Sequence, residues 1–136
     1  MGGLDNFFYP KSVAVIGASN NPAKVGHSLI RNLKRFKGKI YPVNLKEKTI
    51  QGLKAYKSVL DIKQKIDLAV FAIPEPAVYS ALEECGKKGI KKIILITSGF
   101  AEVGNEKGQD KLVKIYKKYK MRILGPNNFG TMNPYI

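Results

Sequence analysis

Short apolar runs alternate along this chain with segments of helical spacing, and this alternation constrains the fold more than any other feature. The runs are rich in β-branched residues and occupy 12–17, 39–44, 67–74, 91–97 and 121–125. Between them, apolar side chains recur three and four residues apart, as on one face of a helix. Strands that are apolar throughout are typical of parallel strands buried on both faces. The sequence therefore predicts an α/β fold with a doubly wound parallel sheet of about five strands.

The chain has 136 residues, which is the size of one domain, and we assign residues 1–136 to a single unit. Cys85 falls at an apolar position of the second helical segment and is expected in the core. The letters "CGKKG" (85–89) predict that this helix ends in lysines and glycine. The less regular stretch 49–62 is interpreted as a short, turn-rich excursion before the third strand.

The net charge of +14 is the strongest signal in the composition. Only three of the 24 basic residues are arginines, at positions 31, 35 and 122, and the other 21 are lysines. Nucleic-acid-binding proteins usually add arginine for phosphate contacts and aromatic residues for stacking. We therefore favour a solvated lysine surface that attracts small polyanions. A basic nucleic-acid-binding module, or a piece of a larger and more acidic protein, stays open as an alternative.

Targeting and redox signals are few. No apolar run reaches the roughly 18 residues that a membrane span requires, so no membrane segment is predicted. The opening "MGGLDNFFYPK" lacks the basic and apolar regions of a secretory signal. With one cysteine the chain cannot form an internal disulfide, which fits the cytoplasm.

Parallel α/β sheets bind ligands at the carboxyl ends of their strands. In this chain the loops that follow the five predicted strands all contain Gly, Pro, Asn or Ser. These loops are 17–26, 42–48, 73–76, 97–104 and 125–130. Their composition favours a ligand crevice over plain connections.

The first loop, "GASNNPAKVG", combines features that suit a phosphate. Gly17 permits a close backbone approach, Ser19 and Asn20 can form hydrogen bonds, and Lys24 offers a positive charge. Val25 and Gly26 open a helix whose N-terminus attracts anions. The loop is longer than the G-x-G-x-x-G fingerprint and lacks its second glycine.

The end of the second strand argues against NAD. An acidic residue normally takes the ribose hydroxyls at this place, but here Asn44 and Lys46 occur instead. A lysine suits a ribose that carries a phosphate, as in NADP or coenzyme A. Alternatively, Lys46 and Lys48 are ordinary surface lysines.

The later loops offer Thr97, Ser98, the backbone amides around Gly99, and Asn127. Glu102 has three interpretations: contact with a phosphorylated partner residue or metal, contact with loop amides, or a helix-start acid. His27 is the sole histidine and receives no role. Since neither paired carboxylates, nor a metal cluster, nor a nucleophile with its base is visible, the residues indicate a binding module rather than a complete enzyme.

A set of motifs follows in order along almost the whole chain: "LDNFFYPKSVAVIGAS", "KVG", "IYPVN", "DLAVFAIP", "ITSGFAEVG" and "RILGPNNFG". Together they resemble the Rossmann-like CoA-binding domain of NDP-forming acyl-CoA synthetases. That family includes the alpha part of ADP-forming acetate–CoA ligase and is related to the alpha subunit of succinyl-CoA synthetase.

The resemblance implies that coenzyme A binds at the strand ends. The residues that would surround its phosphates are Gly17, Ser19, Lys24, Val25 and Gly26, with Asn20 in the same loop. Asn44 and Lys46 would lie by the 3′-phospho-ribose or adenine. Ile73 and Pro74 would lie along the ligand, and Thr97, Ser98 and Gly99 would hold the part near pantetheine, with Asn127 nearby.

The resemblance also implies a reaction: acyl-CoA, ADP and phosphate are converted to the acid, CoA and ATP through a phosphohistidine. The phosphohistidine and ATP-grasp domains lie elsewhere in that family, and His27 does not match the phosphohistidine motif. We therefore expect this chain to be a fragment of a synthetase, with a stand-alone CoA-binding protein as the alternative. An NAD(P)-binding domain of a dehydrogenase or redox sensor is disfavoured by the missing glycine and ribose acid.

Overall fold

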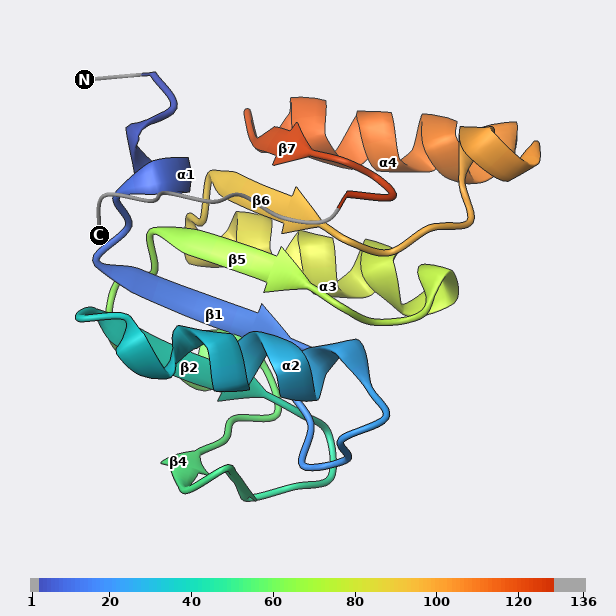
Figure 1. Cartoon of the computed structure of the whole chain (residues 1–136). Coiled ribbons are helices and arrows are strands. Elements are labelled where there is room, and N and C mark those ends of the chain that lie inside the picture. Colours follow the sequence, from blue (N-terminus) through green and yellow to red (C-terminus); the bar gives the residue numbers. More distant parts are fainter. Residues whose placement is uncertain (1–2, 129–136) are drawn as a thin grey trace.

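The computed structural model describes residues 3–128, and a sheet of five parallel strands runs through its centre (Figure 1). The strands are β1 (Ser12–Ile16), β2 (Lys39–Val43), β5 (Leu68–Phe71), β6 (Lys92–Leu95) and β7 (Arg122–Leu124). Their order is β2-β1-β5-β6-β7, and every neighbouring pair is parallel. This is one of the two common doubly wound orders, so the predicted α/β architecture is confirmed.

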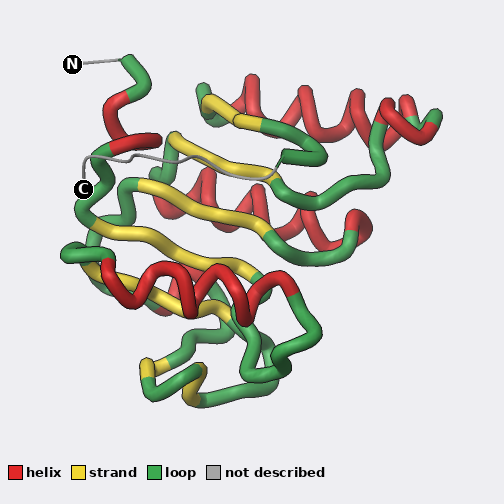
Figure 2. Tube along the Cα trace, in the orientation of Figure 1, coloured by secondary structure: helices red, strands yellow, loops and turns green. Residues whose placement is uncertain are grey.

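Helices cover both faces of this sheet (Figures 1 and 2). The helical elements are α1 (Asp5–Phe8), α2 (Val25–Asn32), η1 (Leu33–Arg35), α3 (Glu75–Lys88), η3 (Ala101–Val103) and α4 (Glu106–Lys118). The helices α1 and α2 lie on one face, and α3 and α4 lie on the other. The helical spacing between the predicted strands corresponds to α2 with η1, to α3 and to α4.

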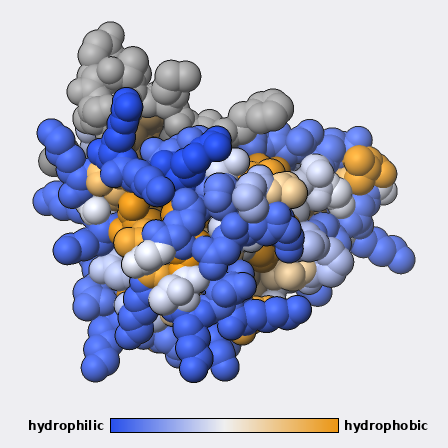
Figure 3. All heavy atoms as spheres, turned by 60° about the horizontal axis from the view of Figure 1, so that its bottom comes forward, coloured by the Kyte–Doolittle hydropathy of each residue, from blue (hydrophilic) through white to orange (hydrophobic). Residues whose placement is uncertain are grey.

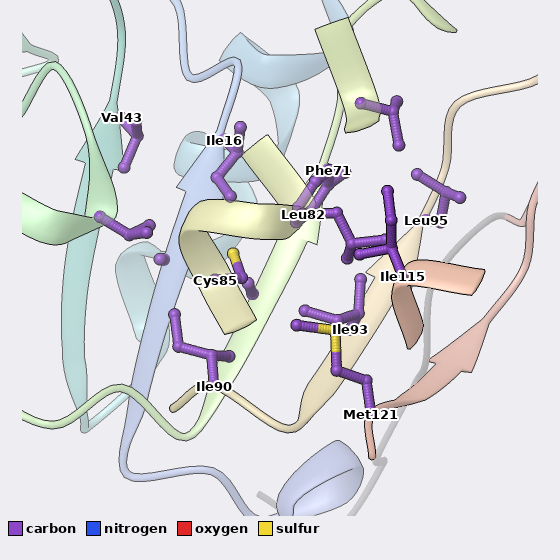
Figure 4. Close-up of a cluster of buried hydrophobic side chains, with 14 of the residues drawn as sticks. Ile16, Val43, Phe71, Leu82, Cys85, Ile90, Ile93, Leu95, Ile115 and Met121 are labelled. Carbon is purple, nitrogen blue, oxygen red and sulfur yellow. The ribbon is translucent and has the colours of Figure 1, made fainter. Parts of the chain in front are cut away.

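Each strand contributes alternate side chains to two separate cores, as the period of two in a strand requires. Val13 and Val15 of β1 pack with Ile30 of α2, whereas Ala14 and Ile16 pack with α3 and α4. The larger core is shown in Figure 4, where the sulfur of Cys85 lies among apolar side chains. Cys85 is fully buried, which confirms its predicted place in the core.

The excursion between β2 and β5 contains a small hairpin. Its strands are β3 (Thr49–Ile50) and β4 (Leu53–Lys54), followed by the short helix η2 (Val59–Asp61). Ile50 and Ile62 are fully buried and anchor this excursion. Tyr56 then bridges to Val43 at the edge of β2. The predicted turn-rich segment is thus confirmed, with two short strands that its sequence pattern did not reveal.

The end of helix α3 and the hydrophilic surface both agree with what the lysine-rich sequence predicts. Gly89 ends α3 in the left-handed conformation after two lysines, as predicted. On the face shown in Figure 3, hydrophilic side chains cover most of the surface around a smaller apolar area.

Within residues 3–128, no helix combines the length and apolar character needed to cross a membrane. Nor do three His, Cys, Asp or Glu residues of this part come together as metal ligands would.

Candidate functional site

The loops that follow β1 and β5 lie side by side at the point where the sheet reverses its winding. After β1 the chain turns to α2 on one face, and after β5 it turns to α3 on the other. Gly17 lies at this point with a φ of +91°. A Cβ on Gly17 would stand 2.3 Å from the carbonyl oxygen of Ala72 and 2.7 Å from Cγ2 of Ile73. Only glycine allows the two loops to approach this closely.

Gly26 brings the start of α2 directly against the end of β1. A Cβ added to Gly26 would stand 1.8 Å from the carbonyl oxygen of Gly17. The helix begins at Val25, as predicted, with Lys24 in an extended N-cap conformation and no side-chain hydrogen bond to the cap. Its first turn contains no acidic residue. The N-terminus of α2 therefore presents its amides, beside the exposed Lys24, in the way that suits an anion.

Two other residues of the first loop hold its shape. Ser19 is 8% exposed, and its Oγ accepts a hydrogen bond from the Asn21 amide at 3.0 Å. Asn20 reaches the hairpin: its Nδ2 donates to the Thr49 carbonyl at 2.9 Å, and its Oδ1 accepts from the Gln51 amide at 2.8 Å. The structure thus uses the polar atoms of Asn20 to attach the first loop to the β3–β4 hairpin.

Asn44 links the second loop to the first. Its Nδ2 donates to the Ala18 carbonyl at 2.9 Å, while its Oδ1 accepts from the amides of Lys46 and Glu47, both at 2.8 Å. These bonds fold the backbone that carries the exposed Lys46. Asn44 and Lys46 therefore occur at the same edge of the sheet but differ in kind, since Asn44 is bonded within the protein and Lys46 extends into solvent.

Hydrogen bonds join the loop after β5 to the loop after β6, and the loop after β6 to the loop after β7. The Thr97 hydroxyl donates to the Ile73 carbonyl at 2.6 Å, and the Asn127 amide donates to the Thr97 carbonyl at 2.9 Å. Ser98 and Pro74 are exposed at this edge. All the predicted site residues thus lie at the carboxyl edge of the sheet. The end of the fifth predicted loop, residues 129–130, lies outside the described residues.

Glu102 contacts the loop amides, which is the second of its three interpretations. Its Oε1 accepts from the Gly99 amide at 2.7 Å, and its Oε2 accepts from the Phe100 amide at 3.2 Å. The hydrogen bond from the Gly99 amide is the main reason that the pKa of the Glu102 carboxyl is lowered. These two amides are therefore bonded within the protein, whereas Ser98 in the same loop is exposed.

Three residues near this loop were not predicted as part of the site. Glu75, Tyr79 and Asn105 form a hydrogen-bonded group beneath Gly99. Asn105 also caps α4, because its Oδ1 accepts from the Gly108 amide at 3.0 Å. An asparagine just before a helical segment is a recognised N-cap signal. That signal was present in the sequence, but the link to Glu75 depends on contacts thirty residues apart.

A separate hollow of about 450 Å³ opens between α4 and β7. It is lined by Gln109, Leu112, Val113, Tyr116, Met121, Arg122, Ile123 and Gly125, none of which is a predicted site residue. Among the described residues, the buried Oε1 of Gln109 has no hydrogen-bond partner. We place the candidate site at the strand-end loops, because they offer close backbone, a helix N-terminus and two exposed lysines.

Comparison with known proteins identifies relatives along almost the whole chain. The family described as "CoA binding domain" matches residues 11–134. Over 128 residues the chain is 55% identical to an ADP-forming acetate–CoA ligase of Methanocaldococcus jannaschii, covering 94% of this chain. Over 135 residues it is 50% identical to the alpha subunit of ADP-forming acetate–CoA ligase II of Pyrococcus furiosus, covering 97% of this chain.

A solved structure has the same fold. It is the dinucleotide-forming acetyl-coenzyme A synthetase 1 of Ca. Korarchaeum cryptofilum in complex with phosphate and ADP, with a TM-score of 0.91 and 45% identity over 96% of this chain. The chain spans 18% of the M. jannaschii relative, 30% of the P. furiosus subunit and 28% of the solved chain. It therefore corresponds to less than a third of each of these proteins.

Proposed function

The chain belongs to the family of CoA-binding domains, and on this premise we propose that it is the CoA-binding part of an ADP-forming acid–CoA ligase. The observation that carries the proposal is the 50% identity, over 135 residues, to the alpha subunit of such a ligase. The geometry supports it, because the predicted binding loops share the carboxyl edge of the sheet, where doubly wound folds bind nucleotides.

The phosphates of CoA are assigned to the start of α2. Gly17 and Gly26 bring backbone to the strand end without side chains in the way, and the first-turn amides of Val25 and its neighbours face the ligand. Lys24 adds a positive charge, and Ser19 and Asn20 support the loop from behind. A diphosphate gains both from the helix dipole and from the nearby cation.

The remaining contacts follow the order of the strands. Lys46 is assigned to the 3′-phosphate of the ribose, with Asn44 holding the turn that presents it. Ile73 and Pro74 are assigned to the middle of the ligand, at the end of β5. Ser98 is assigned to the pantetheine side, where the Thr97 hydroxyl and the backbone of Gly99 and Asn127 hold the loop through hydrogen bonds.

In the ligase reaction this domain would bind and orient CoA. The acyl-CoA, ADP and phosphate would become acid, CoA and ATP, with the phosphohistidine and ATP-grasp parts supplied from outside this chain. The net charge of +14 assists by attracting the polyanionic ligand. The Gly17–Gly26 contact packs strand against helix, which is the role of the third glycine in the dinucleotide fingerprint, and the longer first loop would take the place of the missing second glycine.

Isothermal titration of the purified chain tests the proposal. CoA should bind more tightly than dephospho-CoA, because only CoA offers the 3′-phosphate to Lys46. NADP serves as a control that carries a ribose phosphate without pantetheine. Absence of CoA binding at millimolar concentration would contradict the proposed function, and equal affinity for CoA and dephospho-CoA would remove the role of Lys46.

A further inference from the structure

The loop assigned to the pantetheine side follows β6, and it lies against a carboxylate side chain from the connection that follows β5. Glu75, the first residue of α3, lies below Gly99, so that a Cβ on Gly99 would stand 3.3 Å from the Cβ of Glu75. Gly99 belongs to the loop after β6, whereas Glu75 belongs to the connection after β5. Contact between these two residues therefore joins two loops of the candidate site.

Asn105 closes this contact with its side-chain amide. Its Nδ2 donates to Oε1 of Glu75 at 3.1 Å and to the carbonyl oxygen of Gly99 at 2.9 Å. Its Oδ1 accepts from the Gly108 amide at the start of α4. One asparagine thus fixes the position of the Gly99 carbonyl relative to both α3 and α4.

Tyr79 completes the group. Its hydroxyl donates to Oε1 of Glu75, and its ring packs edge-on against Phe100, with ring centroids 6.2 Å apart. Phe100 is fully buried, and the Nζ of Lys111 lies 4.4 Å from the centroid of the Tyr79 ring on α3. Burial, followed by the hydrogen bond to Glu75 and the charge of Glu75, raises the pKa of Tyr79 to about 12.

The two acidic side chains beside this loop are both held by hydrogen bonds. Glu75 accepts from Tyr79 and Asn105, and Glu102 accepts from the Gly99 and Phe100 amides. Both carboxylates therefore direct oxygen atoms at donors of the protein itself.

We propose that Glu75, Tyr79 and Asn105 are positioning residues for coenzyme A, which hold the Thr97–Gly99 backbone in its ligand-binding conformation. This inference rests on the proposed function, and it adds residues whose identities the sequence pattern did not single out. None of the three needs to touch the ligand. Their effect reaches it through the Gly99 carbonyl and the position of Ser98.

Asn105→Asp is the sharpest test, because it separates capping from positioning. Aspartate caps a helix as well as asparagine does, so the start of α4 keeps its partner. The two donations from Nδ2 are lost, and a second carboxylate is placed beside Glu75. We expect CoA affinity, measured by titration of the full chain, to fall about five- to tenfold, the factor for one lost hydrogen bond or slightly more.

Glu84→Gln provides a matched control on the same helix. Glu84 also accepts a side-chain hydrogen bond, from the Ser58 hydroxyl at 2.5 Å, but lies nine residues further along α3. At 1.5 Å per residue this is about 13 Å from Glu75. Urea unfolding of both variants compares their stability, and only Asn105→Asp should weaken CoA binding.

The double variant Glu75→Gln with Asn105→Asp reverses donor and acceptor. The side-chain amide introduced at position 75 can donate to the carboxylate introduced at position 105, so CoA affinity should recover partly. The Gly99 carbonyl still lacks its donor, so the recovery should not be complete. Wild-type affinity in Asn105→Asp, or an equal loss in Glu84→Gln, would overturn the inference while leaving CoA binding intact. Failure of the unmodified chain to bind CoA would instead contradict the proposed function.

Discussion

Gly26→Ala tests how closely α2 must approach the strand end. In an open helix this exchange stabilises a protein by about 1 kcal/mol, because alanine has the higher helix propensity. Here the added Cβ would stand 1.8 Å from the Gly17 carbonyl oxygen and 3.1 Å from the Cα of Ala18. Carbon and oxygen normally approach to no less than about 3.3 Å. The start of α2 must therefore shift by about 1.5 Å, which is the difference between the 1.8 Å separation and the normal approach of about 3.3 Å.

We expect this shift to outweigh the gain in helix propensity. Overpacking in a well-packed site costs about 1–3 kcal/mol, and the neighbouring atoms here belong to backbone that cannot rotate away. Chemical denaturation should therefore show a net loss in the free energy of unfolding. CoA affinity should fall as well, because the displaced amides at Val25 and beyond would no longer face the phosphates in the proposed site.

Gly86→Ala is the matched control. Gly86 also lies within a helix, but its added Cβ would meet the ring of Tyr119, with 2.3 Å to the nearest ring atoms, on the α3–α4 side of the sheet. That variant should lose stability without a specific loss of CoA affinity. Wild-type stability in Gly26→Ala, or equal CoA affinity in Gly26→Ala and wild type, would refute the assigned role of the Gly17–Gly26 contact.

Other expectations concern single side chains. Lys46→Ala should reduce CoA affinity about tenfold, as for one lost charge-assisted hydrogen bond, and leave dephospho-CoA affinity unchanged; titration with both ligands checks this. The hydrogen bond from the Gly99 amide lowers the folded-state pKa of Glu102. The stability that this carboxylate contributes is therefore present above the ordinary carboxyl pKa and is lost as pH falls through the lowered value. Urea midpoints of wild type and Glu102→Gln should therefore differ at neutral pH and converge in acid, and a constant difference would contradict this. Burial raises the pKa of the Cys85 thiol, so a thiol reagent should label Cys85 only in urea, and rapid labelling of the native chain would count against its core position.

The sheet could be predicted from sequence because its signal is local. Each buried strand is a continuous apolar run, as in β1, and the helices repeat their apolar residues at helical spacing, as with Val78, Leu82 and Cys85 in α3. The hairpin at Thr49–Lys54 could not be predicted in the same way. Its strands have two residues each, which is too short for any period, and their position depends on Ile50 being buried.

The site could be predicted as a set of loops but not as a set of contacts. Gly, Asn and Ser at strand ends indicate turns and ligands equally, and only three-dimensional partners distinguish the two roles. Asn20 bonds to a hairpin about thirty residues away, and Asn44 bonds to Ala18 across the edge of the sheet. Asn105 and Glu75 are separated by a similar number of residues in the sequence, so no local pattern reveals their hydrogen bond.

These partners divide the predicted site into two groups with different physical roles. Asn20, Asn44 and Thr97 are bonded within the protein, and their bonds link successive loops along the edge. Lys24 and Lys46 are exposed, so they remain available to a phosphate. An anion that approaches this edge therefore meets exposed lysine charges on a backbone whose shape is already fixed. Preorganisation of this kind limits the entropy lost on binding, and under the proposed function it would allow a loop without the second glycine to present its amides to a diphosphate.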